Sequence, residues 1–157
     1  MTKNTTTNLK KIVEFLVKKN VKMLSTGGTF KAIKKITDNV IEVSDFTGFE
    51  EMMDGRVKTL HPKNHAGILK KREKKSHLKD LKDNNFENID LVIVNFYPFE
   101  NTLKKTDNHQ KIIENIDVGG PTMVRAAAKN YNDVVVITST SQYSLLIKQL
   151  KLSKGST

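Results

Sequence analysis

The chain has 157 residues, of which 37% are hydrophobic, and it carries a formal net charge of +10 and no cysteine. This length fits one domain around one core, and the lack of cysteine excludes disulfides, thiolate metal sites and a cysteine nucleophile. No run approaches the roughly 18 apolar residues of a membrane span, and the polar start MTKNTTTN lacks a signal peptide's apolar centre, so we expect a cytoplasmic protein.

The positive charge comes almost entirely from lysine, because only Arg56, Arg72 and Arg125 are arginines. Direct reading of bases favours arginine, and stacking on nucleic acid needs aromatic residues, which make up 6% of this chain. The charge therefore suits a small anionic ligand at least as well as a polymer, and we expect neither nucleic acid nor membrane as a partner. The four histidines lack HExxH-like spacing, so we expect no metal site.

The first half of the chain alternates helical and strand patterns. In NLKKIVEFLVKKN, apolar residues from Leu9 to Val17 follow the helical spacing i, i+3, i+4, i+7, i+8, which predicts a helix with Asn8 as its N-cap. VKMLS predicts a strand, FKAIKKI a short helix and VIEVS a second strand. A long polar loop with DGRVKTLHP at residues 54–62 follows, and HAGIL is interpreted as a further short strand.

The second half continues the alternation. A charged helix is predicted for residues 73–85, and the nearly continuous apolar run IDLVIVNFY predicts a strand covered on both faces. A turn at Pro98, helices near HQKIIENI and over TMVRAAAKN, a last strand in DVVVIT and a closing helix in SQYSLLIKQLKL follow. The alternation predicts an α/β fold, a single domain over residues 1–157 with a parallel sheet and helices on both faces.

Polar segments follow the predicted strands. In parallel α/β sheets ligands bind where the carboxyl ends of the strands meet the loops, so STGGT, NFYPF, DVGGPT and the 54–62 loop are expected on one rim. Two glycines between a strand and a helix let backbone N–H groups approach an anion, so phosphate is the expected ligand of STGGT. The alternative for STGGT is an ordinary tight turn.

Individual side chains in these segments suit an anionic ligand. Arg56 and Lys58 are two residues apart, so in an extended backbone both point the same way and could clamp one anion, with Thr59 as a further donor. Asn95 and Tyr97 follow a buried strand and can hydrogen-bond to a planar ligand or hold a proton. The alternative for the aromatic residues here is packing over the sheet edge.

The segment DVGGPTMVRAAAKN reads as a second glycine-rich helix start, with Asp117 ahead of it and Pro121 in its first turn. Arg125 and Lys129 are four residues apart and share one helical face. The alternative interpretation is a helix cap with exposed basic residues, which is the commoner meaning of such a pattern.

Taken together, STGGT, EVSDFTGFEEMMDGRVKTLHPKNHAGIL, IDLVIVNFYPFE and ENIDVGGPTMVRAAAKN resemble the successive hallmark segments of the IMP cyclohydrolase domain of the bifunctional enzyme that ends purine nucleotide synthesis. The resemblance extends over residues 9–145. Four long segments in the same order are far more specific than a short glycine-rich pattern. The fold that the resemblance implies is the methylglyoxal-synthase-like variety of parallel α/β domain.

The resemblance implies that a formylated aminoimidazole carboxamide ribonucleotide loses water and becomes IMP, without a metal or organic cofactor. This ring closure needs orientation, oxyanion stabilisation and proton transfer. By resemblance, Lys58 faces the developing oxyanion, Asp117 accepts a proton from the attacking amide, and Tyr97 and Lys129 complete the proton network. The substrate-binding residues implied are Thr26, Gly27, Gly28, Thr29, Arg56, Thr59, Asn95, Val118 and Gly119.

Two departures from the family pattern shape the expectations. Family members begin with a strand and a Ser-Asp-Lys-Thr-like loop that supplies a lysine to the phosphate, whereas MTKNTTT stands in that place here. The first strand is therefore expected to be absent, which leaves an exposed sheet edge or a gap in the core. The chain stops at Thr157, before the closing helices and the transformylase domain, so we expect a domain truncated at both ends.

Other functions remain open at this point. Methylglyoxal synthase shares the fold, although RVKTLHP and AAAKN look specific to the cyclohydrolase. A non-catalytic nucleotide-binding or regulatory module is a second alternative, because the same fold serves that purpose in carbamoyl phosphate synthetase. The expected partner is a purine ribonucleotide, and a homodimer could shelter the exposed sheet edge.

Overall fold

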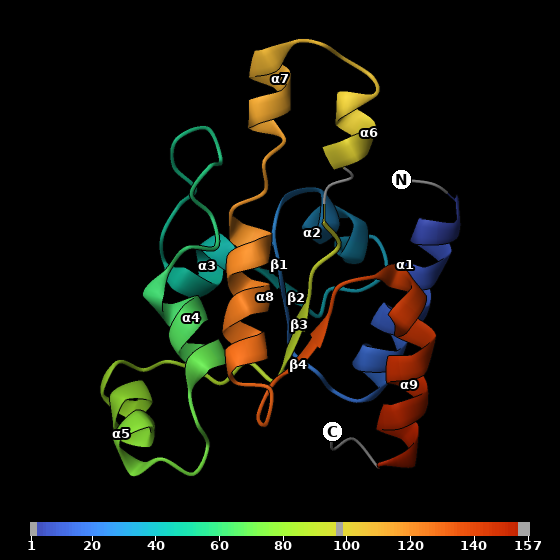
Figure 1. Ribbon diagram of the computed structural model, residues 1–157. Helices are drawn as coiled ribbons and strands as arrows, with labels where there is room; N and C mark the ends of the chain where they lie inside the picture. Colours follow the sequence, from blue (N-terminus) through green and yellow to red (C-terminus); the bar gives the residue numbers. More distant parts are fainter. Residues whose placement is uncertain (1–2, 97–98, 154–157) are drawn as a thin grey trace. The chain divides into compact units, whose positions relative to one another are not determined.

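The computed structural model describes residues 3–96 and 99–153. Its internal contacts divide the chain into two compact units, which are described one at a time (Figure 1). Unit 1 comprises residues 1–64 and 139–157, and unit 2 comprises residues 65–138. Each unit contains one pair of parallel strands. The prediction of a single domain stays a prediction.

Unit 1 places helices around a short parallel strand pair. Strand β1 (Met23–Ser25) runs beside β2 (Val40–Glu42), with Met23 opposite Val40 and Ser25 opposite Glu42. The helices of unit 1 are α1 (Lys3–Lys18), α2 (Gly27–Lys34), α3 (Val43–Thr47), the start of α4 (Pro62–Leu69), the 3₁₀ turn η1 (Thr140–Gln142) and α9 (Tyr143–Leu152). Helices α2 and α3 both pack against the strand pair.

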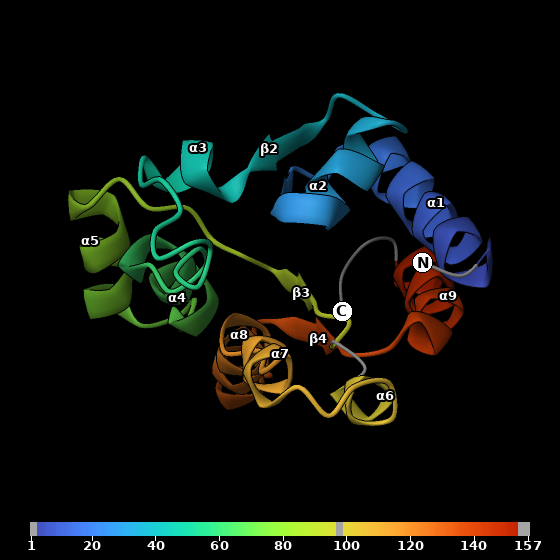
Figure 2. The same cartoon turned by 90° about the horizontal axis from the view of Figure 1, so that it is seen from above.

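Helix α1 confirms the predicted helical periodicity. Its apolar stripe buries Ile12, Val13 and Leu16, and α9 packs alongside α1 with Tyr143 buried (Figure 2). The predicted N-cap at Asn8 is wrong, because the helix already begins at Lys3. The segment before Leu9 thus continues α1 instead of forming a strand.

Two further expectations about secondary structure need correction. The strand predicted over VIEVS ends at Glu42, and α3 begins at the next residue and ends at Thr47. Gly48 is its C-cap, with a φ of +71° that is typical of this position. The strand predicted for HAGIL is wrong, because this segment belongs to α4. Pro62 stands at the first position of α4, where its fixed φ and missing N–H favour a helix start.

Unit 2 is built around the second strand pair. Strand β3 (Leu91–Ile93) runs parallel to β4 (Val135–Ile137), with Leu91 opposite Val135. Helix α8 (Gly119–Lys129) packs on both strands (Figure 1). The core of unit 2 consists of Ile68, Val92, Val94, Ala126, Ala127 and Val134. The remaining helices are α5 (Lys75–Asp83), α6 (Phe99–Leu103) and α7 (His109–Glu114).

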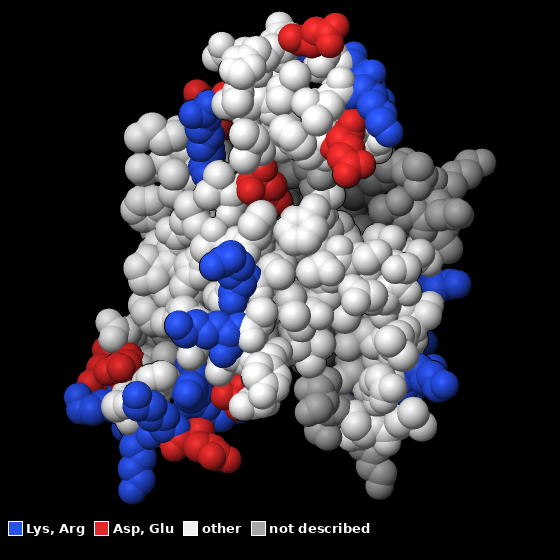
Figure 3. All heavy atoms as spheres, viewed as in Figure 1, with Lys and Arg blue, Asp and Glu red and all other residues white. Residues whose placement is uncertain are grey.

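The long charged segment of unit 2 forms an exposed helix, as predicted. In α5 only Leu81 is buried, and lysine and acidic side chains alternate along the rest (Figure 3). Lys79 and Asp83, one helical turn apart, form an ion pair of 2.6 Å. Helix α6 was not anticipated, and the predicted turn at Pro98 lies outside the described residues.

The predicted class, an α/β fold with parallel strands among helices, is confirmed. In the part of the chain that the structure describes, β1 pairs with β2 alone and β3 with β4 alone. None of the helices in residues 3–96 and 99–153 is long and apolar enough to cross a bilayer.

Candidate functional site

The STGGT segment forms the junction between β1 and α2. Thr26 is the N-cap of α2 with an extended backbone, and its hydroxyl makes no capping hydrogen bond. Gly27 opens the helix at φ +53°, a left-handed conformation that favours glycine. The first N–H groups of a helix have no partner within it, and the helix dipole makes this end attractive to anions. The junction therefore has the local geometry of a phosphate site.

A cavity of about 510 Å³ opens at this junction and lies wholly within unit 1. We call it the α2 cavity. Its lining residues are Thr26, Gly27, Gly28, Lys31, Glu42, Val43, Ser44, Phe49, Glu50, Glu51 and Lys58. The volume is in the usual range for small-ligand sites. Of the predicted site residues, the structure brings Thr26, Gly27, Gly28 and Lys58 together here.

Lys58 reaches the cavity from a tight hairpin formed by residues 51–58. Met52 and Val57 exchange two backbone hydrogen bonds of 3.1 and 3.2 Å, and the chain reverses through left-handed residues including Gly55 at φ +86°. Lys58 Nζ lies 4.0 Å from the position that a Cβ on Gly27 would take. The ammonium thus stands next to the first residue of α2.

The ammonium of Lys58 already has an acidic partner. Lys58 Nζ and Glu51 Oε2 are 2.8 Å apart, and the Lys58 side chain is 34% exposed. The acidic residues Glu42, Glu50 and Glu51 share the cavity with Lys31 and Lys58. The cavity is therefore electrostatically mixed, with cations beside the helix start and carboxylates around them.

The other predicted residues of unit 1 lie near this cavity without lining it. Arg56 is exposed and ends the tight turn, so the extended backbone expected across residues 56–58 is wrong at this position. The carbonyl of Thr59 accepts hydrogen bonds from His61 N at 2.9 Å and from Asn64 Nδ2 at 3.1 Å. Asn64 is buried, so it anchors the end of the loop on α4. Thr29 is exposed in α2.

In unit 2 Asp117 organises the start of α8. Asp117 Oδ1 accepts a hydrogen bond of 2.9 Å from Gly120 N. A Cβ on Gly120 would clash with the Asp117 carboxylate and would come within 2.9 Å of Val94 Cγ1. Gly119 begins the helix, and Val118 before it is exposed. Asp117 thus stabilises the start of α8, and its catalytic role stays a prediction.

The remaining predicted residues of unit 2 are dispersed. Lys129 is exposed at the last position of α8, ten residues beyond Gly119, or about 15 Å along the helix axis. The structure does not bring Lys129 and Asp117 together, because they lie at opposite ends of one helix. Asn95 is exposed just after β3, and Tyr97 lies outside the described residues.

Sequence reasoning missed seven lining residues, which are Lys31, Glu42, Val43, Ser44, Phe49, Glu50 and Glu51. Glu42, Phe49, Glu50 and Glu51 were parts of a strand or loop without an assigned role, and Lys31 was one lysine among many. One signal was available for Lys31, which follows Gly27 by four residues and therefore shares its helical face. For Glu51 the available signal was the turn-forming MMDGR segment. A hairpin turn there brings the residues on its two sides together, and these include Glu51 and Lys58.

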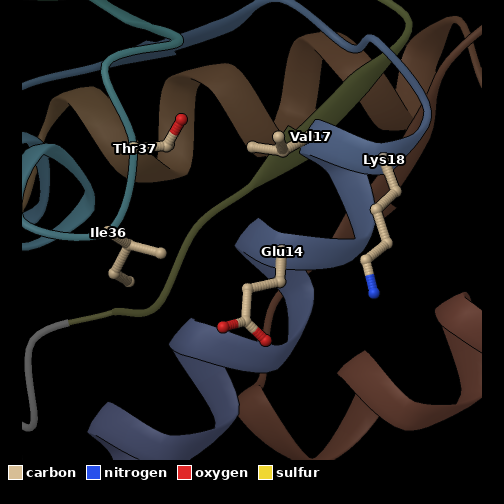
Figure 4. A pocket seen from close by; sticks show the side chains of 5 residues that line it. All are labelled: Glu14, Val17, Lys18, Ile36 and Thr37. Carbon is tan, nitrogen blue, oxygen red and sulfur yellow. The ribbon is translucent and has the colours of Figure 1, made fainter.

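A second hollow in unit 1 contains none of the predicted site residues. Its volume is about 320 Å³, and Figure 4 shows Glu14, Val17 and Lys18 projecting from α1, with Ile36 and Thr37 on the segment after α2. Glu14 also pairs with Lys10 at 3.8 Å. Among residues 3–96 and 99–153, no group of three or more His, Cys, Asp or Glu side chains could hold a metal ion.

Comparisons with known proteins identify the family of the chain. The family model described as the MGS-like domain matches residues 8–122. The chain belongs to the MGS-like domain family. The match includes β1, the α2 cavity, β3 and the start of α8. The expected methylglyoxal-synthase-like fold is confirmed.

Relatives of this MGS-like domain include two clostridial proteins, each described as bifunctional purine biosynthesis protein PurH. The protein of Acetivibrio thermocellus is 55% identical over 135 residues, which cover 85% of this chain and 26% of the relative. That of Clostridium acetobutylicum is 50% identical over 141 residues, covering 90% and 28%. The chain thus spans about a quarter of the length of these relatives. The predicted kinship with the bifunctional purine enzyme is confirmed.

A solved structure shows the same arrangement of this MGS-like domain. The crystal structure of ForH superposes with a TM-score of 0.81 at 29% sequence identity, covering 95% of this chain and 76% of that chain. The likeness extends over nearly the whole chain and supports the order of strands and helices described above.

Proposed function

We propose that the chain is an IMP cyclohydrolase domain that closes the second ring of a formylated aminoimidazole carboxamide ribonucleotide. The observation that carries the proposal is the Lys58 ammonium beside the glycine start of α2, in a cavity large enough for a small ligand. The kinship with PurH proteins supports a purine biosynthetic substrate. A purine ribonucleotide is therefore the proposed partner.

The substrate's 5′-phosphate would bind at the start of α2. The free N–H groups of the first helical turn and the hydroxyl of Thr26 are suitable donors, and Gly27 and Gly28 leave the backbone open to close approach. Thr29, Arg56 and Thr59 would add polar contacts from the same unit. Such contacts hold the reacting groups in place, which is a large part of the catalysis of a ring closure.

The ring closure itself needs a donor for an oxyanion and an acceptor for a proton. The carboxamide nitrogen bonds to the formyl carbon, and the formyl oxygen becomes an oxyanion that Lys58 would stabilise. Asp117 would take the proton that this nitrogen gives up. The oxygen then leaves as water, with one hydrogen from the carboxamide nitrogen and one from the formamide nitrogen, and a C=N bond remains.

The similarity to PurH proteins also suggests roles for further residues. Tyr97 and Lys129 would move protons, and Asn95, Val118 and Gly119 would contact the ligand. A cytoplasmic location and a homodimer also remain predictions.

The test is the rate of IMP formation from the formylated substrate, followed by absorbance. Wild-type protein should accelerate the reaction, and Lys58→Ala should lose at least about a hundredfold in kcat, since one oxyanion donor is typically worth that much. Lys19→Ala, which removes an exposed lysine after α1, is the matched control for loss of one positive charge. A folded wild-type protein without turnover, or a fully active Lys58→Ala variant, would contradict the proposal. Binding of IMP without turnover would point to the nucleotide-binding module instead.

A further inference from the structure

The α2 cavity contains a carboxylate that a site for an anionic ligand does not obviously need. Glu51 Oε2 lies 2.8 Å from Lys58 Nζ, and this ammonium lies 4.0 Å from the position of a Cβ on Gly27. An anion in this cavity, either inorganic phosphate or the oxyanion of the proposed ring closure, would seek the same ammonium. Glu51 and the ligand are therefore competitors for Lys58.

The geometry of the hairpin fixes this pairing. Met52 and Val57 form a hydrogen-bonded antiparallel pair, so Glu51 and Lys58 are the next pair outward. In antiparallel strands such a pair is not hydrogen-bonded, its side chains share one face, and its Cα atoms are closer than in a hydrogen-bonded pair. The contact between Glu51 and Lys58 is thus built into the register.

Gly55 leaves the room in which the two side chains meet. A Cβ at this position would lie 2.6 Å from Lys58 Cε and 3.5 Å from Glu51 Oε1. The aliphatic part of Lys58 therefore lies directly against Gly55, and the Glu51 carboxylate is close to the same position. Lys58 is held by packing as well as by charge.

The pair is also weak enough to be exchanged. The side chain of Glu51 is 58% exposed, and ion pairs exposed to this degree contribute little net free energy. A phosphate, which carries more charge than one carboxylate and also binds the helix start, can take Lys58 from Glu51. An anion in the cavity can therefore displace the Glu51 carboxylate from Lys58.

We propose that Glu51 is a positioning residue that holds the Lys58 ammonium in place until an anion, either inorganic phosphate or the oxyanion formed during ring closure, replaces the Glu51 carboxylate. This inference rests on the proposed function for its effect on turnover, but its effect on anion binding stands on the cavity alone. The proposal sets Glu51 apart from Glu50, a neighbouring carboxylate that lines the same cavity but forms no ion pair with Lys58 among the described residues.

The two glutamates provide a matched experiment. Glu51→Gln and Glu50→Gln each remove one negative charge from the same cavity, so the general electrostatic effect on an anion is shared. Only Glu51→Gln removes the competitor for Lys58. Binding of inorganic phosphate by calorimetry and, in parallel, kcat and KM for ring closure are measured on both variants and on the wild type.

The expected result is a split between affinity and turnover. Glu51→Gln should bind phosphate at least about threefold more tightly than Glu50→Gln, because Lys58 is no longer shared. Its kcat should fall at least about tenfold below that of Glu50→Gln, because the ammonium is no longer held in place. A purely structural role would weaken binding and turnover together.

The opposing results are distinct. Equal phosphate affinities in the two variants would contradict the claim that Glu51 and the anion compete for Lys58. A wild type that binds no phosphate would contradict it as well. Equal kcat values would overturn the positioning role. A wild type that binds phosphate but forms no IMP would refute the proposed function. The competition between Glu51 and the anion would then be decided by comparing the phosphate affinities of Glu51→Gln and Glu50→Gln.

Discussion

At the scale of single residues, two glycines in left-handed conformations have different surroundings. Gly55 has φ +86°, and a Cβ there would meet the Lys58 side chain. Gly48 has φ +71°, and a Cβ there would meet no atom within 4 Å. Alanine would therefore strain the backbone at both positions. Only at Gly55 would its Cβ also clash with the Lys58 side chain.

This difference gives a first prediction. Gly48→Ala should lower the free energy of unfolding by about 1–2 kcal/mol, the strain of a left-handed alanine. Gly55→Ala should suffer the same strain and also displace Lys58, so its kcat should drop whereas that of Gly48→Ala should not. Urea unfolding and the ring-closure rate measure the two effects. Equal activity in both variants would show that Lys58 does not depend on the space above Gly55.

At the scale of whole elements, the start of helix α8 combines a structural and a proposed chemical role. Asp117 Oδ1 caps the helix through Gly120 N, and the proposed mechanism needs the same carboxylate as a base. Asparagine retains the capping oxygen but cannot accept the proton, whereas alanine removes both. Two substitutions can thus separate the roles.

The second prediction follows from this separation. Asp117→Asn should keep the free energy of unfolding within about 0.5 kcal/mol of wild type, and Asp117→Ala should lower it by about 1 kcal/mol. Both variants should lose ring-closure activity. Denaturant unfolding and initial rates are the measurements, and full activity in Asp117→Asn would leave Asp117 with only its capping role.

The elements also show what sequence could and could not predict. Helix α1 follows from apolar periodicity, and the described strands β3 and β4 follow from nearly continuous apolar runs. Helix α5 was predicted from its charged composition, and α8 from its glycine-rich start. HAGIL was misjudged because five residues are too few for periodicity to separate a strand from a helix. In the folded chain Gly67 packs against the backbone near Glu87. A Cβ at Gly67 would lie 2.7 Å from the Glu87 carbonyl oxygen. The sequence does not reveal this tertiary contact.

The site was predictable to a similar degree. Thr26, Gly27, Gly28 and Lys58 were found because glycine-rich turns and basic loop residues carry a recognisable chemistry. Glu51 was missed because an acidic residue contradicts the expectation of an anion site, and its contact with Lys58 depends on the register of the hairpin. The assignment of the remaining residues stays a prediction.

At the scale of the whole molecule, the proposed catalytic residues are distributed over both compact units. Lys58 belongs to unit 1 and Asp117 to unit 2. If both act on one substrate, their contributions to catalysis depend on each other. Residues that act as a unit give strongly non-additive losses, whereas independent sites give losses that multiply.

The third prediction uses this dependence. The double variant Lys58→Ala with Asp117→Asn should have a kcat close to that of the more damaged single variant. Initial rates of the wild type, both single variants and the double variant complete the cycle. A double variant whose loss is the product of the single losses would show that the two residues act independently.

A fourth prediction concerns the stability of the folded chain against pH. Burial lowers the pKa of His65 below its usual value of 6.5, and His65 Nε2 is buried without a hydrogen-bond partner in the described structure. The unfolded chain therefore binds this proton first as the pH falls. The stability that neutral His65 contributes is complete above 6.5 and decreases as the pH falls toward the lower folded pKa.

Urea unfolding at about pH 7.5 and about pH 5.5 tests this dependence. The free energy of unfolding should decrease between the two values in the wild type. His65→Gln, which cannot titrate, should show a smaller decrease. An equal decrease in both proteins would assign the pH dependence to other groups.

The hairpin of residues 51–58 also determines how this loop tolerates changes in length. Surface loops usually accept insertions and deletions, because few contacts depend on their number of residues. Here one residue added between Met52 and Val57 would shift the register, and a shift by one residue turns every side chain of a strand to the opposite face. Glu51 and Lys58 would then no longer meet. The number of residues in this turn is thus as much a part of the site as the side chains that line it.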